Sequence, residues 1–151
     1  MEFTSSDQKF SISIQQAIVI ELERICTDAV SKETGGVLIG HYSENLNTAL
    51  ITSITGPPPD SRAGKTWFHR GIEGLRDIFQ QCSNTYYVGE WHFHPFASPT
   101  PSLQDLRQMK RIALDKQYNC PEPILIILGG KMGHFNIRSF VFPNGICIEM
   151  F

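Results

Sequence analysis

The sequence has little of what marks membrane or secreted proteins. No apolar run approaches the roughly 20 residues that a membrane-spanning helix needs. The first residues, Met-Glu-Phe-Thr-Ser-Ser-Asp, lack the basic and then apolar pattern of a signal peptide. These two absences predict a cytoplasmic protein that does not contact a membrane.

The net charge and the spacing of the cysteines argue against further classes of protein and of site. The 13 Lys and Arg residues are spread along the chain against 15 Asp and Glu residues, and the formal net charge is −2. No nucleic-acid partner is therefore expected. The four cysteines, Cys26, Cys82, Cys120 and Cys147, form no Cys-x-x-Cys pair, which excludes a zinc knuckle and a redox motif. In a reducing cytosol they are expected to be buried thiols.

The apolar pattern predicts an α/β fold in a single domain over residues 1–151. A short polar leader precedes strands at 9–14, 37–42, 48–55, 66–70, 85–93, 124–128, 134–142 and 146–151 and helices from 15 to about 31, from 71 to 83 and from 102 to about 116. The expected apolar stripes of the first two helices are Ile18, Ile20, Leu22, Ile25, Cys26 and Val30, and Ile72, Leu75, Ile78 and Phe79. This order favours a mixed, largely antiparallel sheet with helices packed on its faces.

The most informative stretch is 90–105, which reads Glu-Trp-His-Phe-His-Pro-Phe-Ala-Ser-Pro-Thr-Pro-Ser-Leu-Gln-Asp. In a strand, residues two apart point to the same face, so His92 and His94 project side by side. Pro95 ends this strand. Ser102 then stands at a helix N-cap, with Asp105 on the same side of the first turn. Two imidazoles and one carboxylate leave one position of a tetrahedral shell open, as in a catalytic zinc site.

Each of these residues alone has a simpler explanation. A single histidine on a strand is more often a packed or surface residue than a ligand, and Ser-x-x-Asp by itself is a variant of the capping box. Only the combination favours a metal site. His41, His69 and His134 lie outside the stretch and are expected to be structural or surface residues.

A second informative place is the run Lys-Glu-Thr-Gly-Gly at 32–36. A double glycine between a helix and a strand is usually turn chemistry, in which positive φ is tolerated. It would also let the backbone approach a metal centre closely and let Glu33 lean over it. Glu33 alone, however, is more simply a solvated carboxylate at a helix end.

Together, these residues resemble the signature of the JAMM (MPN, Mov34/JAB) metalloprotease family, Glu…His-x-His-x7-Ser-x-x-Asp, with every spacing kept. The run Glu-Thr-Gly-Gly-Val-Leu-Ile-Gly at 33–40 is also similar to that family's segment around its catalytic glutamate. The resemblance implies one JAMM/MPN domain with a layered architecture related to that of cytidine deaminases. The His-x-Glu and Pro-Cys-x-x-Cys motifs of the deaminases themselves do not occur.

The resemblance also implies a role for each residue of the signature. His92, His94 and Asp105 are the ligands of Zn²⁺, Glu33 is the general base for the attacking water, and Ser102 steadies the tetrahedral oxyanion. Such a set is chemically consistent, because a metal can polarise the scissile carbonyl while a carboxylate moves the proton and a hydroxyl stabilises the developing charge.

This sequence departs from the family pattern in two ways. Many members have Ser or Thr where Phe93 stands, and by alternation Phe93 should point away from the metal and affect packing only. The long insertion of eukaryotic deubiquitinases is absent. The chain is therefore more similar to the short prokaryotic JAB proteins, including those of bacterial CBASS antiphage operons.

The function that this resemblance implies is hydrolysis of the bond after the C-terminal glycine of a ubiquitin-like protein or its conjugate. Ubiquitin-activating and ubiquitin-conjugating enzyme homologues are further expected partners. Two alternatives stay open: trimming of a ubiquitin-like sulfur-carrier protein, and a non-catalytic MPN scaffold, against which the intact signature argues. The sequence identifies no substrate-binding residues, although the Pro- and Gly-rich loop at 56–65 is long enough to have a function.

Overall fold

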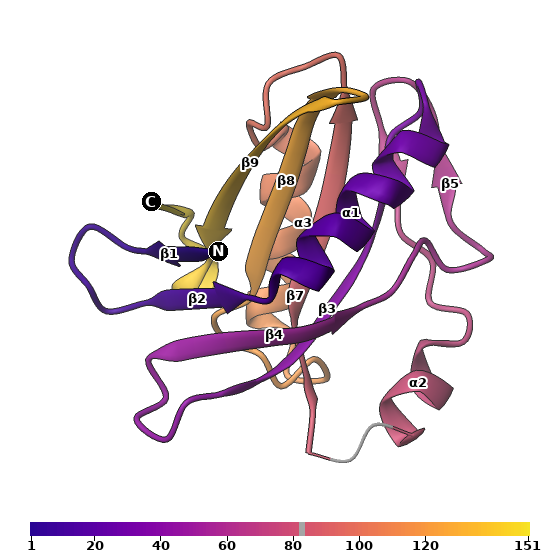
Figure 1. The fold of residues 1–151 in the computed structure, drawn as a ribbon. Coiled ribbons are helices and arrows are strands. Elements are labelled where there is room, and N and C mark those ends of the chain that lie inside the picture. Colours follow the sequence, from indigo (N-terminus) through magenta and orange to yellow (C-terminus); the bar gives the residue numbers. More distant parts are fainter. Residues whose placement is uncertain (82–83) are drawn as a thin grey trace.

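Eight strands form one mixed sheet in the computed structural model, which describes residues 1–81 and 84–151 (Figure 1). In chain order the elements are β1 (Glu2–Thr4), β2 (Ser11–Ile14), α1 (Gln16–Ala29), β3 (Thr34–Tyr42), β4 (Thr48–Ile54), β5 (Arg62–Ala63), β6 (Phe68–His69), α2 (Leu75–Gln81), β7 (Tyr86–Pro95), α3 (Leu103–Leu114), β8 (Ile124–Lys131), β9 (His134–Val141), a 3-10 turn (Pro143–Gly145) and β10 (Ile148–Met150).

The strand order is β1-β2-β4-β3-β7-β8-β9-β10, and β5 and β6 form a separate two-stranded sheet. Parallel pairing joins β2 to β4 and β7 to β8, whereas the other neighbours are antiparallel. The expected α/β fold with a mixed, largely antiparallel sheet is therefore confirmed. A single domain over 1–151 stays a prediction.

Helices α1 and α3 lie on opposite faces of the sheet, with α3 behind β8 in Figure 1. Alternation along β7 divides its side chains between the two faces. Trp91 and Phe93 are buried in the apolar cluster that includes α1, and Phe93 packs edge-on against Phe135 with ring centroids 5.7 Å apart. Phe93 thus points away from the two histidines, as expected, and His92 and His94 face α3.

The first residues are part of the sheet, because residues 2–4 form the edge strand β1 antiparallel to β2. At the opposite edge, β10 brings the end of the chain next to β1. Thr4 and Phe151 exchange backbone hydrogen bonds of 2.7 and 3.0 Å, and Ser5 forms a bridge with Met150. The edge strands of the eight-stranded sheet therefore meet near the two termini, as Figure 1 shows.

The central strands are longer than the sequence predicts. Strand β7 continues to Pro95 instead of ending at Phe93, because β8 continues beside it and Pro95 pairs with Gly130. The turn expected at 129–133 is consequently confined to its last residues. Gly129 is needed in β8, since a Cβ there would lie 2.5 Å from the Ala97 carbonyl oxygen. The first and last predicted strands are shorter, at Ser11–Ile14 and Ile148–Met150.

The second predicted helix is shorter and less buried than expected. It spans Leu75–Gln81 and contains no buried residue. Ile72 precedes it, is 71% exposed, and donates its backbone N–H to the Asp60 carboxylate. The predicted end of this helix at 82–83 and the thiol of Cys82 lie outside the described residues. Of the helices that the structure does describe, none combines the length and the apolar character that crossing a membrane requires.

Burial differs from the expected pattern at several other positions. Ile20 of α1 and Val30, which directly follows this helix, are exposed, and Val19 is buried instead. The expectation of buried thiols holds for Cys26 and Cys120 but is wrong for Cys147, which is exposed. Position 147 lies just before the short edge strand β10, where little of the fold covers it.

The double glycine lies inside β3, so the expected turn with positive φ is wrong. Gly35 pairs with His92 and Gly36 with Trp91 in the β3–β7 register. A Cβ on Gly36 would lie 2.1 Å from the Thr55 carbonyl oxygen and 2.8 Å from Trp91 Nε1. Glycine is required here because the neighbouring backbone and the Trp91 indole occupy the space of a side chain.

We predict that Gly36→Ala lowers the free energy of unfolding by about 1–3 kcal/mol, because the added methyl must displace the Thr55 carbonyl or the Trp91 ring. Urea unfolding measures the change. Gly56→Ala is the matched control, because Gly56 has no atom within 4 Å of the added Cβ and no positive φ. Equal stability of the two variants would contradict the steric explanation.

Candidate metal centre

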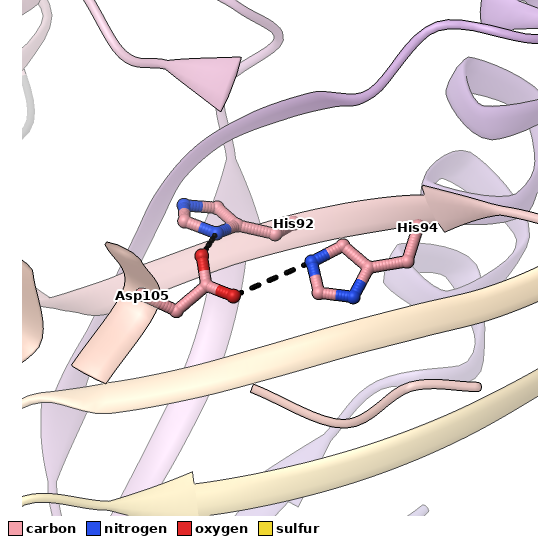
Figure 2. A group of neighbouring side chains, drawn as sticks. All are labelled: His92, His94 and Asp105. Atoms are coloured by element: carbon pink, nitrogen blue, oxygen red, sulfur yellow. Dashed lines mark hydrogen bonds and ion pairs between the residues drawn. The ribbon is translucent and has the colours of Figure 1, made fainter. Parts of the chain in front are cut away.

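Two strand residues and one helix residue meet near the end of β7 (Figure 2). His92 and His94 project from β7, and Asp105 lies in the first turn of α3. Asp105 Oδ1 is 2.7 Å from His92 Nδ1, and Asp105 Oδ2 is 3.4 Å from His94 Nε2. All three side chains are buried, and one ligand-type atom of each lies within 4.8 Å of the others.

The position of Asp105 follows from the way α3 begins. The Asp105 backbone N–H donates to Ser102 Oγ at 3.1 Å, and the Ser102 backbone N–H donates to Asp105 Oδ2 at 2.7 Å. This pair of bonds is a capping box. Oδ2 thus fixes the start of the helix while Oδ1 faces His92. The capping box and the cluster of ligand-type atoms are present together and are not alternatives.

Space for the His92 ring comes from a glycine on the neighbouring strand. A Cβ on Gly35 would lie 2.9 Å from His92 Cδ2 and 2.7 Å from a ring carbon of Phe68. The Phe68 ring itself packs edge-on against the His92 ring at a centroid distance of 5.6 Å. The close backbone approach expected at the double glycine is therefore present.

The cluster has the composition and the unsatisfied atoms of a metal site. In the part of the chain that the structure describes, the Nε2 atoms of His92 and His94 are buried without a hydrogen-bond partner, although His92 Nε2 lies 3.4 Å from a carboxylate oxygen of Glu90. Such atoms are uncommon in native proteins and need an explanation. Two imidazoles and one carboxylate are a usual ligand set for a catalytic Zn²⁺. A cation among these side chains would supply the missing partner of His94 Nε2.

Burial and the neighbouring side chains shift the pKa values of His92 and Asp105 in opposite directions. Burial alone would lower the pKa of His92, but hydrogen bonding to Asp105 and the adjacent Glu90 raise this pKa to about 9. Burial would raise the pKa of Asp105, but its bonds to His92 and His94 hold that pKa well below its usual value. Because metals bind neutral imidazole, cation binding would displace a proton from His92.

Glu33 and Ser102 flank the cluster. Glu33 directly precedes β3 and is half-buried, not fully solvated. Burial raises the pKa of its carboxyl, the nearby Asp105 raises it further, and His94 and His92 lower it. The exposed Ser102 uses its hydroxyl oxygen as an acceptor for the Asp105 N–H, which leaves the hydroxyl proton free to be donated elsewhere.

The structure thus places the predicted site residues around one point, whereas His41, His69 and His134 do not belong to the cluster. Beside the cluster lies a buried ion pair that was not predicted from the sequence, in which Arg70 Nε is 2.7 Å from Glu90 Oε1. The position of Glu90 beside the cluster could have been predicted from the sequence, because Glu90 stands two residues before His92 and shares its face of the strand. The position of Arg70 could not, because its contact with Glu90 spans 20 residues.

Comparison with known proteins identifies the family of this chain. Residues 15–142 match the family of prokaryotic homologs of the JAB domain, and the chain belongs to this family. This match confirms the resemblance to the prokaryotic JAB subgroup of the JAMM proteins.

Individual relatives agree with this assignment. A CD-NTase/cGAS isopeptidase of Enterobacter hormaechei subsp. hoffmannii is 44% identical over 146 residues, which are 95% of this chain and 81% of that protein. A probable metalloprotease of Sinorhizobium fredii is 32% identical over 65% of this chain and 63% of that one. The solution structure of a protein from Desulfitobacterium hafniense has a TM-score of 0.63 and 16% identity over 91% of this chain and 88% of that one, which is a likeness in fold. The family and the names of these relatives support a peptidase.

We predict that the purified protein contains one zinc ion per chain and that His92→Ala and His94→Ala each reduce this content to near zero, because each removes a ligand-type atom of the buried cluster. Elemental analysis measures the stoichiometry. His134→Ala is the control, since His134 is exposed and lies outside the cluster. Unchanged zinc in both cluster variants would contradict the assignment.

Proposed function

We propose that this protein is a zinc-dependent isopeptidase or peptidase that hydrolyses the bond after the C-terminal glycine of a ubiquitin-like protein or its conjugate. The observation that carries the proposal is the buried set of His92, His94 and Asp105 with Glu33 beside it. A structural zinc site would normally contain four protein ligands, whereas a catalytic site has three.

In this proposal His92, His94 and Asp105 hold the ion. When bound, Zn²⁺ supplies a Lewis acid that polarises the scissile carbonyl and lowers the pKa of the attacking water. The protein's contribution is to fix the three ligands. Asp105 is fixed by the capping box, and the two histidines are fixed by the pairing of β7 with β3 and β8 on either side.

Glu33 is suited to move the proton from the attacking water to the leaving amine. Its carboxyl lies near the cluster, and burial raises its pKa from the ordinary glutamate value towards the working pH, which favours both uptake and release of a proton. Its backbone N–H donates to the Gly64 carbonyl at 2.9 Å, which anchors this residue to the segment after β5.

Ser102 is suited to stabilise the oxyanion. Its hydroxyl oxygen already accepts one hydrogen bond, from the Asp105 N–H at 3.1 Å. The hydroxyl hydrogen can therefore be donated to an oxygen on which negative charge develops, and such donors stabilise the transition state. Ser102 is exposed, so a substrate carbonyl can reach it.

The proposed substrate class is supported by the name of a relative. A relative is named as a CD-NTase/cGAS isopeptidase, and by analogy we propose that this protein acts on conjugates in a bacterial antiphage system of that kind. Ubiquitin-activating and ubiquitin-conjugating enzyme homologues would be its partners in the cytoplasm. Trimming of a sulfur-carrier protein would use the same residues on a different tail.

We predict that Glu33→Ala retains zinc and the fold but reduces hydrolysis by about 10²- to 10⁴-fold, because a general base outside the metal shell contributes to the transition state and little to metal binding. Cleavage of a ubiquitin-like fusion and elemental analysis are measured on the same preparation. Glu21→Ala, at an exposed position of α1, is the control. Loss of zinc would make Glu33 a ligand, and full activity would remove it from the mechanism.

We further propose that the glycine-ended tail lies extended in a groove formed by the 56–65 loop and a strand edge. The edges of the main sheet meet each other, but β5 within this loop exposes Arg62 and Ala63 and pairs with β6 on one side only, among the residues described. An extended peptide can add to such an edge through backbone hydrogen bonds.

We predict that fusions ending in Gly-Gly before the cut are cleaved faster than those ending in Ala-Gly, and that Leu-Leu tails are cleaved slowest, because only small residues pass close to the metal. Shortening the loop at 57–59, ahead of Asp60, should lower all cleavage rates without changing zinc content. Initial rates with the intact and the shortened loop test both statements. Equal rates for the three tails, or no effect of the shorter loop, would refute this groove.

A further inference from the structure

Glu90 is a fully buried carboxylate beside the candidate metal centre and is neither one of the three ligand-type residues nor the proposed general base. It stands two residues before His92 on β7 and shares its face, and its side chain is 0% exposed. A buried charge is costly unless it is paired and hydrogen-bonded. Its partners therefore indicate what the residue does.

Each oxygen of Glu90 has a distinct environment. Oε1 accepts from Arg70 Nε at 2.7 Å and from the Tyr87 hydroxyl at 3.3 Å. Oε2 accepts from Gln108 Nε2 at 2.5 Å and lies 3.4 Å from His92 Nε2. Arg70 thus neutralises the charge of Glu90 by binding Oε1, and Oε2 faces His92.

Each of the three nitrogens of the Arg70 side chain donates a hydrogen bond. The two nitrogens other than Nε donate to the Gly71 carbonyl at 2.7 Å and to the Tyr118 hydroxyl at 2.9 Å. These contacts fix Arg70, which follows β6, in one orientation. The Glu90 carboxylate is therefore held rigidly, and so is its oxygen that points at His92.

The His92 ring consequently lies between two carboxylates. Nδ1 meets Asp105 Oδ1 at 2.7 Å, and Nε2 faces Glu90 Oε2. Only one nitrogen of a neutral imidazole carries a proton, and metal-ligating histidines almost always donate that proton to a carboxylate, carbonyl or water. In this structure Glu90 is the carboxylate placed to receive it.

We propose that Glu90 is a positioning residue for His92: its carboxylate fixes the rotation and the proton position of the imidazole and so prepares the ring for zinc. This inference rests on the proposed function. Gln108 extends the arrangement, because it stands three residues after Asp105 on the same side of α3 and holds the oxygen that faces His92. One helix thus supplies both Asp105 and the support of Glu90.

The test is the zinc affinity of metal-free Glu90→Gln protein, measured by competition with a chromophoric chelator. The amide keeps the size of the side chain but cannot accept from both Arg70 and His92. We expect an affinity about 10- to 100-fold lower than wild type, the usual loss when such an outer partner is removed. We also expect a changed visible spectrum of the Co²⁺-substituted protein, which reports ligand geometry and not global stability.

Two further variants separate positioning from stability. Tyr87→Phe removes a donor from the far oxygen of the same carboxylate and should leave zinc affinity and the Co²⁺ spectrum unchanged. The double variant Arg70→Met with Glu90→Met replaces the ion pair by apolar side chains, an exchange that often preserves stability. The metal-free double variant should have the same stability to unfolding as the metal-free wild type. It should nevertheless bind zinc about 10- to 100-fold more weakly than wild type.

Wild-type zinc affinity in the folded double variant, or in Glu90→Gln with an unchanged Co²⁺ spectrum, would overturn the inference while leaving the proposed function intact. Equal losses in Tyr87→Phe and Glu90→Gln would also overturn it, because the effect would then belong to the network and not to the His92 contact. Wild-type protein that binds no zinc would overturn the metal assignment itself.

Discussion

The capping box at the start of α3 is the constraint on which the rest of the site depends. A helix N-terminus leaves backbone N–H groups without partners, and here Ser102 and Asp105 satisfy two of them reciprocally. The Asp105 carboxylate is thereby held by the helix backbone through Oδ2, and its other oxygen, Oδ1, contacts His92 on β7. The capping box that stabilises the start of the helix thus also sets the geometry of a buried cluster.

On β8 the α3-facing side of the sheet is apolar, unlike the cluster of ligand-type side chains. Strand β8 fills this face with Leu125 and Ile127, which pack against Met109 and Ile112 of α3. On β7 the corresponding positions are charged or ionisable, and burial of such groups destabilises the fold unless they are paired. Pairing is achieved with Arg70 after β6 and with side chains of α3. The segment that carries β5 and β6 is therefore tied to the same point as the ligand-type residues.

Several sequence expectations failed for a common reason, which is that strand pairing depends on neighbours. The three residues of β1 give no periodic signal and become a strand only beside β2. Pro95 was expected to stop β7, but the parallel neighbour β8 extends the pairing to Gly130. The double glycine looked like a turn, whereas its small size is needed inside β3, where the Thr55 carbonyl and the Trp91 indole leave no room for a Cβ. The apolar residues of α2 find no covering element among the described residues and stay partly exposed.

The sequence predicts the α/β fold, the two histidines on one face of a strand, and Asp105 at the start of a helix, because strand alternation and helix capping are local rules that act over a few residues. Spacing also led to the family, which the match over 15–142 bears out. The contact of His92 with Asp105 and the neutralisation of Glu90 by Arg70 are known only from the folded structure. These contacts join residues 13 and 20 positions apart across different elements, and no local pattern encodes which side chains meet when separate elements pack together.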